Sequence, residues 1–296
     1  MHQYIHAISK TKQMKLVIVL FWFTSCFPLL AQRPEIGIVL DLENDSLLSA
    51  SGYHYVEVSI SKYFSPKNVS DDAFAENLQR IKRMKMKLYA CNVFMPAEMK
   101  LVGPSANEAS ILAYTDIVFQ RCMAAGVRLI IWGSGGARRI PDDFDSNKAR
   151  AQFINIARKV AVQAERYKIV IALESLNRGE TNFLNSLQET YEVIQEVNHP
   201  NLRLNTDSYH RSKEHELPAA IENTGGYLVN CELAGNDRLA PSETNSGEIP
   251  EYLRSLRKIN YKGLIFLECK WDNLSTQAAP AYQYLQKQID EVFGRR

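Results

Sequence analysis

The sequence has little of what several common protein classes require. Its five cysteines are too few and too scattered in 296 residues to form a disulfide framework. The glycines around Gly133 form no dinucleotide-binding fingerprint, and no P-loop lysine follows them. Linkers rich in proline, glycine or serine, low-complexity stretches and helical repeats are also absent. These absences favour one globular domain with free, buried thiols, although Cys231 and Cys269 could lie on neighbouring strands and form a bridge.

Charge of one sign is not in excess either. Residues 1–31 carry Lys10, Lys12 and Lys15 and no acid, so the rest of the chain holds 32 basic against 33 acidic residues. A near-neutral chain offers no general electrostatic attraction to nucleic acid, so we expect no nucleic-acid partner.

The N-terminal segment resembles an export signal. The three lysines precede an apolar run over residues 16–32, which is short for a membrane span, and Ala31 provides a cleavage point. We therefore expect residues 1–31 to be a signal peptide, with Met14 as an alternative start, and the mature chain to be periplasmic without a transmembrane span. Residues 23–26 also form a loose lipoprotein box, which would anchor the chain through Cys26.

After the signal, β-rich runs alternate with amphipathic stretches. This alternation predicts parallel strands with crossover helices, and eight such units over about 250 residues match the size of a (β/α)8 TIM barrel. We expect a single-domain α/β barrel over residues 32–296. The predicted strands are 35–42, 54–60, 88–95, 128–134, 169–175, 202–207, 227–233 and 264–269.

Four acidic residues end strand-like runs in the second half of the chain: Glu174, Asp207, Glu232 and Glu268. A carboxylate at the end of a buried strand is costly unless something pairs with it. The carboxyl ends of barrel strands meet at one mouth, where active sites are built. The simplest occupant of a ring of four carboxylates is a divalent cation.

At these residues the chain resembles the xylose-isomerase-like TIM barrels, most closely the ketose 3-epimerases and hydroxypyruvate isomerases. The resemblance spans roughly residues 35–290. It rests on four motifs: Glu174-Ser-Leu-Asn-Arg-Gly-Glu180, Asp207-Ser-Tyr-His210, Asn230 to Arg238, and Tyr261-Lys-Gly263 leading to Glu268. The order and spacing of the motifs, rather than any one of them, make the resemblance specific.

The resemblance implies a metal site made by the four carboxylates, with one departure. Where the family has histidine or glutamine on the seventh strand, this chain has Glu232, and Asn230 replaces a second histidine. An all-oxygen shell favours Mn²⁺ or Mg²⁺ over Zn²⁺. Arg238 or Lys270 could offset the excess negative charge. The alternative is that Glu232 pairs with one of these cations and binds no metal.

The resemblance also implies a function. We expect a metal-dependent sugar isomerase or epimerase that acts on a small ketose through an enediolate, with Glu174 and Glu268 as the acid/base pair. Glu180, His210 and Arg238 would bind substrate oxygens. Two alternatives stay open: an exported 3-keto-glycoside lyase or hydrolase on the same barrel, and a non-catalytic sugar-binding barrel. Relatives are often dimers or tetramers, so a homo-oligomer is also an open alternative.

Glycine-rich residues 133–136 lead into a pair of arginines. Arg138 and Arg139 follow Gly-Ser-Gly-Gly-Ala, and either could bind an acid group of a substrate. A loop with this composition is more typical of a solvated connection. We therefore predict that both arginines are exposed.

Overall fold

Eight parallel strands close into a barrel in which each strand pairs with the next and the last pairs with the first. The computed structural model describes residues 33–294. The strands are β1 Ile36–Val39, β2 Tyr55–Ser59, β3 Lys87–Asn92, β4 Leu129–Trp132, β5 Val170–Glu174, β6 Leu202–Asp207, β7 Leu228–Leu233 and β8 Leu264–Leu267. The predicted barrel is confirmed, and every predicted strand is present, most of them with shorter ends.

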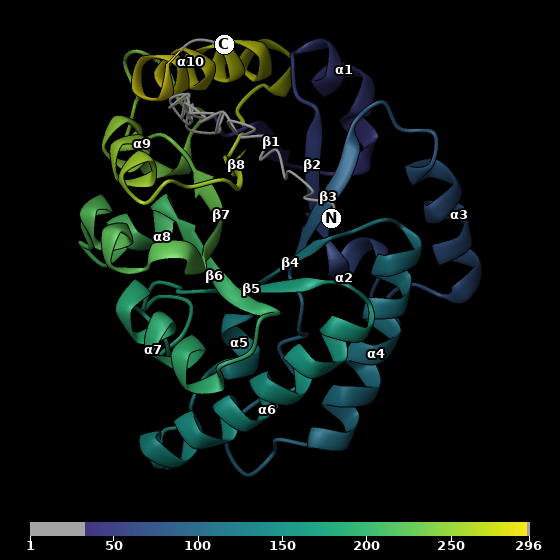
Figure 1. Cartoon of the computed structure of the whole chain (residues 1–296). Helices are drawn as coiled ribbons and strands as arrows, with labels where there is room; N and C mark the ends of the chain where they lie inside the picture. The colour runs from purple at the N-terminus through teal and green to yellow at the C-terminus, as the bar shows by residue number, and fades with distance from the viewer. Residues whose placement is uncertain (1–32, 295–296) are drawn as a thin grey trace, which may run out of the picture. The chain divides into compact units, whose positions relative to one another are not determined.

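Helices surround the barrel (Figure 1). They are α1 Asp45–Ala50, α2 Ile60–Tyr63, α3 Asp71–Ile81, α4 Glu108–Ala124, α5 Gly135–Arg138, α6 Ser146–Arg166, α7 Leu187–Val197, α8 Ser208–Lys213, α9 Ile249–Lys258 and α10 Leu274–Phe293. Short 3-10 turns lie at Leu42–Asn44, Pro218–Asn223, Gly225–Tyr227 and Asn236–Arg238.

Each of the five longest outer helices begins after a polar residue that caps it. In each case the side chain accepts a hydrogen bond from a free backbone N–H of the first turn, which fixes where the helix begins. The caps are Ser70, Asn107, Asp145, Ser186 and Asn273, before α3, α4, α6, α7 and α10.

Side chains alternate between two cores along the strands. In β4, Ile130 and Trp132 pack in the layer between barrel and helices, whereas Leu129 and Ile131 face the barrel interior. Phe266 of β8 fills the interior beside β1, and a Cβ at Gly37 would collide with its ring. Apolar side chains thus fill the barrel interior away from the carboxyl ends of the strands, and polar side chains lie at those ends.

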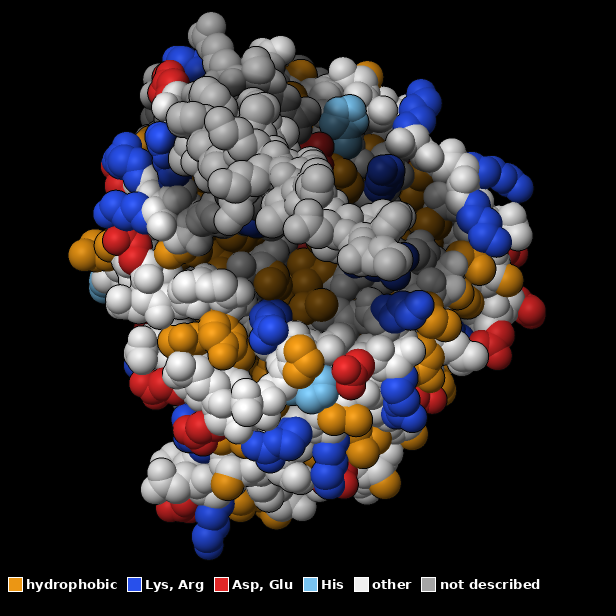
Figure 2. Space-filling view, viewed as in Figure 1, with side chains coloured by type: hydrophobic (Ala, Val, Ile, Leu, Met, Phe, Trp, Pro, Cys, Tyr) orange, Lys and Arg blue, Asp and Glu red, His pale blue; other side chains and the backbone are white. Residues whose placement is uncertain are grey.

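The structure also bears on the predictions for the cysteines and for a membrane span, but not on those for the N-terminal segment. Cys91, Cys122, Cys231 and Cys269 are all free thiols, and Cys269 lies just after β8 rather than within it. No helix within residues 33–294 is long and apolar enough to cross a membrane. On the face seen in Figure 2, basic and acidic side chains are interspersed around a central hollow. The signal peptide, its cleavage and the lipid anchor concern residues outside the described range and stay predictions.

Candidate metal and active site

The four carboxylates predicted from the strand ends come together at one end of the barrel. Glu174 and Asp207 are the last residues of β5 and β6, and Glu268 directly follows β8. Asp207 and Glu232 are paired in register on adjacent strands. Oxygens of Asp207, Glu232 and Glu268 all lie within 4.8 Å of one another, as do ligand atoms of Glu174, Asp207 and His210. Two overlapping groups therefore share Asp207.

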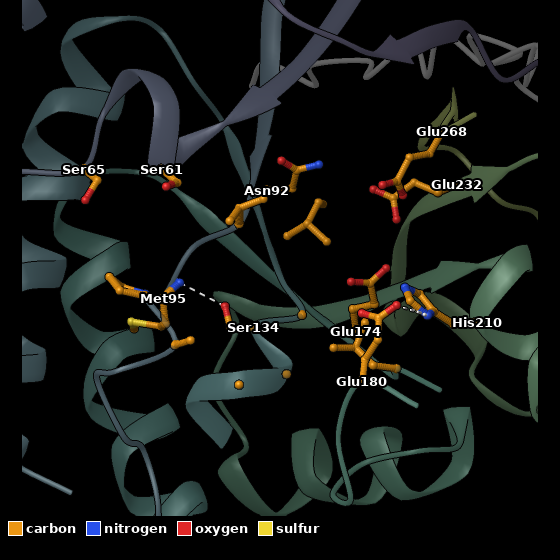
Figure 3. A pocket seen from close by; sticks show the side chains of 18 of the residues that line it. Ser61, Ser65, Asn92, Met95, Ser134, Glu174, Glu180, His210, Glu232 and Glu268 are labelled. Carbon is orange, nitrogen blue, oxygen red and sulfur yellow. Dashed lines mark hydrogen bonds and ion pairs between the residues drawn. The ribbon is translucent and has the colours of Figure 1, made fainter. Parts of the chain in front are cut away.

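A cavity of about 520 Å³ opens onto this group. Figure 3 shows Glu174, Glu232 and Glu268 reaching toward the same space, with Glu180 and His210 beside Glu174. The five substrate-binding and acid/base candidates Glu174, Glu180, His210, Arg238 and Glu268 all line this cavity, together with Glu232. The sequence motifs thus converge on one pocket, and the individual roles stay predictions.

The backbone around Glu174 is held by a buried arginine. Arg138 is fully buried and donates from Nη1 to the Glu174 carbonyl oxygen at 2.7 Å and from Nη2 to that of Leu184 at 3.3 Å. Burial lowers the pKa of Arg138 to about 10. The prediction that Arg138 is solvated is therefore wrong, whereas Arg139 is exposed. Because carbonyl acceptors exist in every loop, composition alone did not reveal this arginine as a structural support.

A glycine makes room for the Glu174 side chain. A Cβ at Gly133 would lie 2.5 Å from Glu174 Oε2, closer than any real contact of that kind. The carboxylate therefore occupies the volume that a side chain after β4 would otherwise fill, which explains a glycine at this position.

Buried amides bridge the carboxylates. Asn205 Nδ2 donates to Glu174 Oε1 at 3.0 Å and to Glu232 Oε2 at 2.6 Å, and Asn230 Nδ2 donates to Asn205 Oδ1 at 3.0 Å. Both asparagines are fully buried. The neutral amide lets two carboxylates approach each other and fixes one oxygen of each. Asn205 was not predicted, although it shares the inward face of β6 with Asp207.

A fifth carboxylate was also missed. Glu57, in the middle of β2, is fully buried, and both of its oxygens lack a hydrogen bond that meets ordinary geometry. Val56 and Val58 pack in the outer core, so Glu57 faces the barrel interior. Burial raises the pKa of Glu57 well above its ordinary value; nearby Glu268 adds to the shift, and Glu232 opposes it. A single acid flanked by valines in a predicted barrel strand was the available signal.

Burial raises the pKa of the other carboxyl groups as well. It does so strongly for Glu174 and Glu232, and their acidic neighbours add to the effect. Burial raises the pKa of Asp207 to about 6, against the opposing charge of Arg238. It raises the pKa of Glu268 to about 7, with Asp207 adding and Arg238 opposing. The group therefore resists full ionisation at neutral pH without added positive charge.

Arg238 supplies part of that charge. Its Nη2 lies 3.4 Å from Asp207 Oδ2 and forms an ion pair with Glu268, while its guanidinium stacks 4.7 Å from the Tyr209 ring centre. Burial disfavours its charge, but Asp207 and Glu268 outweigh this and raise the pKa of Arg238. Arg238 and Lys270 were the two cations expected to offset the excess negative charge of the carboxylates. Arg238 does so, whereas Lys270 forms no ion pair within residues 33–294. The alternative pairing of Glu232 with Arg238 or Lys270 is likewise not found there.

His210 is neutral and oriented by its neighbours. Burial lowers the pKa of His210 to about 4. Asn177 Nδ2 lies 2.8 Å from Nδ1 and Glu180 Oε1 lies 3.8 Å from it, while Nε2 lies 3.5 Å from Asp207 Oδ2. With the Asn177 amide as donor to Nδ1, the imidazole proton belongs on Nε2, directed at Asp207.

The donor set fits a hard divalent cation. Glu232 Oε1 is buried without a hydrogen bond, and Asp207 Oδ2 has only the longer contacts with Arg238 and His210 given above. Buried acceptors without donors are costly, and an ion such as Mg²⁺ or Mn²⁺ prefers oxygens of this kind. The buried carboxylates, together with His210, are therefore consistent with a divalent-metal site.

The fold and the site together define the class of this protein. It is a TIM barrel of eight parallel strands with a buried group of carboxylates, suited to a metal ion, at the carboxyl ends of the strands. Residues 46–290 match the family model described as "Xylose isomerase-like TIM barrel". The chain belongs to this family.

Known proteins place the chain more narrowly. It is 30% identical over 145 residues to a D-psicose 3-epimerase of Enterocloster bolteae, an alignment that covers 47% of each chain. The chain spans about half the length of the curated relatives it matches. It is thus a distant homologue of ketose 3-epimerases, a family of metal-dependent isomerases.

Solved structures share the same fold. D-allulose 3-epimerase from Methylomonas sp., in complex with D-allulose, superposes with a TM-score of 0.72 at 20% identity, covering 87% of this chain and 98% of that one. A 3-keto-D-glucoside 4-epimerase from E. coli superposes with a TM-score of 0.71 at 18% identity, covering 86% and 100%. At these identities the likeness establishes the fold alone.

Proposed function

We propose that this protein is a divalent-metal-dependent epimerase or isomerase of a ketose or related hydroxy ketone, and that Glu174 and Glu268 transfer the proton. The observation that carries the proposal is the placement of these two carboxylates. They enter one cavity from β5 and from the end of β8, and each belongs to one of the two overlapping ligand groups that share Asp207 (Figure 3). Two carboxylates on separate strands suit this chemistry, because one can remove a proton from a carbon while the other donates a proton to the opposite face or to the neighbouring carbon.

Glu174, Asp207, Glu232 and Glu268 would hold the ion, and the oxygen donors favour Mn²⁺ or Mg²⁺. When bound, such an ion stabilises the negative charge that develops on the oxygens of a hydroxy ketone. The protein side chains do the remaining work. Arg138 and Asn205 hold the backbone and side chain of Glu174, and Arg238 balances charge at Asp207 and Glu268.

The raised carboxyl pKa values suit this role. A Glu268 pKa of about 7 would let the same group accept and return a proton near neutral pH. Neutral His210 offers an Nε2–H to a substrate oxygen close to Asp207, and half-exposed Glu180 lies at the cavity edge. These contacts support the substrate-binding roles proposed for His210, Glu180 and Arg238.

The test combines metal binding with turnover. The chain is stripped of metal, titrated with Mn²⁺ and Mg²⁺ by calorimetry, and then assayed with D-psicose, D-fructose and L-ribulose by NMR. We expect one tightly bound ion and interconversion of at least one ketose pair, with both lost in Glu174→Gln. Exposed Glu165→Gln on α6 serves as the matched control. Absence of binding at millimolar metal would contradict the proposal and leave a metal-free, non-catalytic sugar binder.

A second candidate function uses the same proton abstraction on a 3-keto-glycoside, with loss of the group at the neighbouring carbon. The cavity of about 520 Å³ lies within the range of about 300–1,000 Å³ that is typical of ligand pockets, so it also has room for a glycoside. The similarity in fold to a 3-keto-D-glucoside 4-epimerase agrees with such a substrate. Export of the chain to the periplasm, which we also propose, would suit an enzyme of glycan breakdown.

A further inference from the structure

The cavity has two dissimilar halves. The carboxylates, His210 and Arg238 come from the ends of β5 to β8, whereas the facing half follows β2, β3 and β4. Figure 3 shows Ser61, Ser65 and Ser134 across the open space from Glu174, Glu232 and Glu268. We call the residues Ser61, Asn68, Val93 and Ser134 the distal wall. None of these residues belongs to the metal group or to the substrate-binding set proposed above.

The distal wall presents hydrogen-bond donors that the protein does not use. Ser61 Oγ accepts from Asn68 Nδ2 at 2.9 Å, and Ser134 Oγ accepts from the Met95 backbone N–H at 2.9 Å. Within residues 33–294 neither hydroxyl donates a hydrogen bond in return. A serine hydroxyl has one donor and can rotate it, so both protons are free for oxygens of a ligand in the cavity.

The distal wall also holds an apolar side chain in a strained, exposed position. Val93 lines the cavity, is 53% exposed and has a backbone φ of 51°. A β-branched residue rarely adopts this left-handed conformation, and such strain clusters at binding and active sites. Ser134 also has a positive φ of 50°, and its hydrogen bond to Met95 joins the loops after β3 and β4. The two strained loops support each other where they face the cavity.

The charges of the cavity decide the class of ligand. Among the described lining residues Arg238 is the one Lys or Arg, and it is already paired with Asp207 and Glu268. A phosphate group would need a cation or a cluster of N–H donors on the distal wall. Free hydroxyl donors beside an apolar side chain suit an uncharged sugar ring, which offers oxygens at its edge and C–H groups on its face.

We infer that the distal wall is a second sugar subsite, so that the substrate is a glycoside whose keto-bearing ring lies on the carboxylates while the attached ring lies on Ser61, Asn68, Val93 and Ser134. This inference rests on the proposed function, because it assigns the keto-bearing ring to the carboxylate half. It adds the substrate class that the metal site alone leaves undefined.

The test compares two probes on the Mn²⁺-loaded full chain: the 3-keto derivative of glucose and the 3-keto derivative of trehalose, both radiolabelled. Equilibrium dialysis counts bound label, and chromatography of the bound fraction distinguishes the intact disaccharide from any product of turnover. We expect the disaccharide to bind at least tenfold tighter than the monosaccharide. A double variant, Ser61→Ala with Asn68→Ala, should weaken the disaccharide about three- to tenfold for each hydrogen bond lost and leave the monosaccharide unchanged.

Two further variants separate a subsite from a change in folding. Val93→Gly removes the apolar side chain but relieves its backbone strain, so the chain keeps its fold while the preference for the disaccharide falls. Exposed Asn147→Ala, on α6, should change neither affinity. Equal affinity for both probes would overturn the subsite, and so would an equal loss of affinity for both probes in the double variant. In either case, binding of the monosaccharide would still support the proposed function. Binding of neither probe would overturn both.

Discussion

Replacing Glu57 by glutamine should change how the stability of the metal-free protein depends on pH. Burial raises the pKa of Glu57 well above its ordinary value, so the folded chain holds a proton there that the unfolded chain releases once the pH exceeds about 4.3. The contribution of Glu57 to the free energy of unfolding is therefore fully present at low pH, and it is lost as the pH rises toward the pKa of Glu57 in the folded chain. One such proton changes the free energy of unfolding by about 1.4 kcal/mol per pH unit.

Glu57→Gln keeps the shape of the side chain and removes the titration. Between pH 6 and pH 7.5, the stability of the EDTA-treated variant should fall less steeply than that of the wild type, by about 1.4 kcal/mol per pH unit. Urea unfolding followed by tryptophan fluorescence at several pH values measures both slopes. Glu76→Gln, at an exposed site on α3, should leave the wild-type slope unchanged. Equal slopes for Glu57→Gln and the wild type would refute a protonated Glu57 in the folded barrel.

Two further predictions concern the metal group itself. Glu268→Gln should reduce kcat by at least a hundredfold, because it removes one member of the proposed proton-transfer pair, while thermal unfolding stays close to that of the wild type; near-wild-type turnover in a ketose assay would rule out the acid/base assignment. Glu232→His should raise the affinity for Zn²⁺ or Co²⁺ relative to Mn²⁺, since imidazole suits the softer ions; competitive metal titration with an unchanged order of preference would show that residue 232 is not a ligand.

The fold could be predicted from the sequence because its signal is repeated. Eight apolar runs alternate with helix-like segments, and one misplaced boundary does not alter the barrel they form. Strand ends were less certain: the run over 88–95 loses Val93, whose left-handed backbone ends β3. A short β-rich run does not reveal that its last residues turn away to line a cavity.

The metal group could be predicted in part for a similar reason. Glu174, Asp207, Glu232 and Glu268 each end a strand-like run, so barrel topology alone brings them together. Glu57 and Asn205 lie within their strands and looked like isolated polar residues. Their roles depend on strand register and on which neighbours face them, and neither is visible in a single sequence. Arg138 was mistaken for a solvated residue because its partners are backbone carbonyls, which carry no sequence signal.

The amide network explains how a glutamate can stand at residue 232, where the family resemblance leads us to expect histidine or glutamine. An acid at residue 232 faces Glu174 and Asp207, and like charges at this distance oppose ionisation of the group. Asn205 donates to one oxygen of Glu174 and one of Glu232, and Asn230 holds Asn205 in turn. Glu232 Oε1 is left buried without a hydrogen bond. The network therefore orients the Glu232 carboxylate and leaves one of its oxygens for a cation. If the site only buried an ion pair, it would not need such an unpaired oxygen.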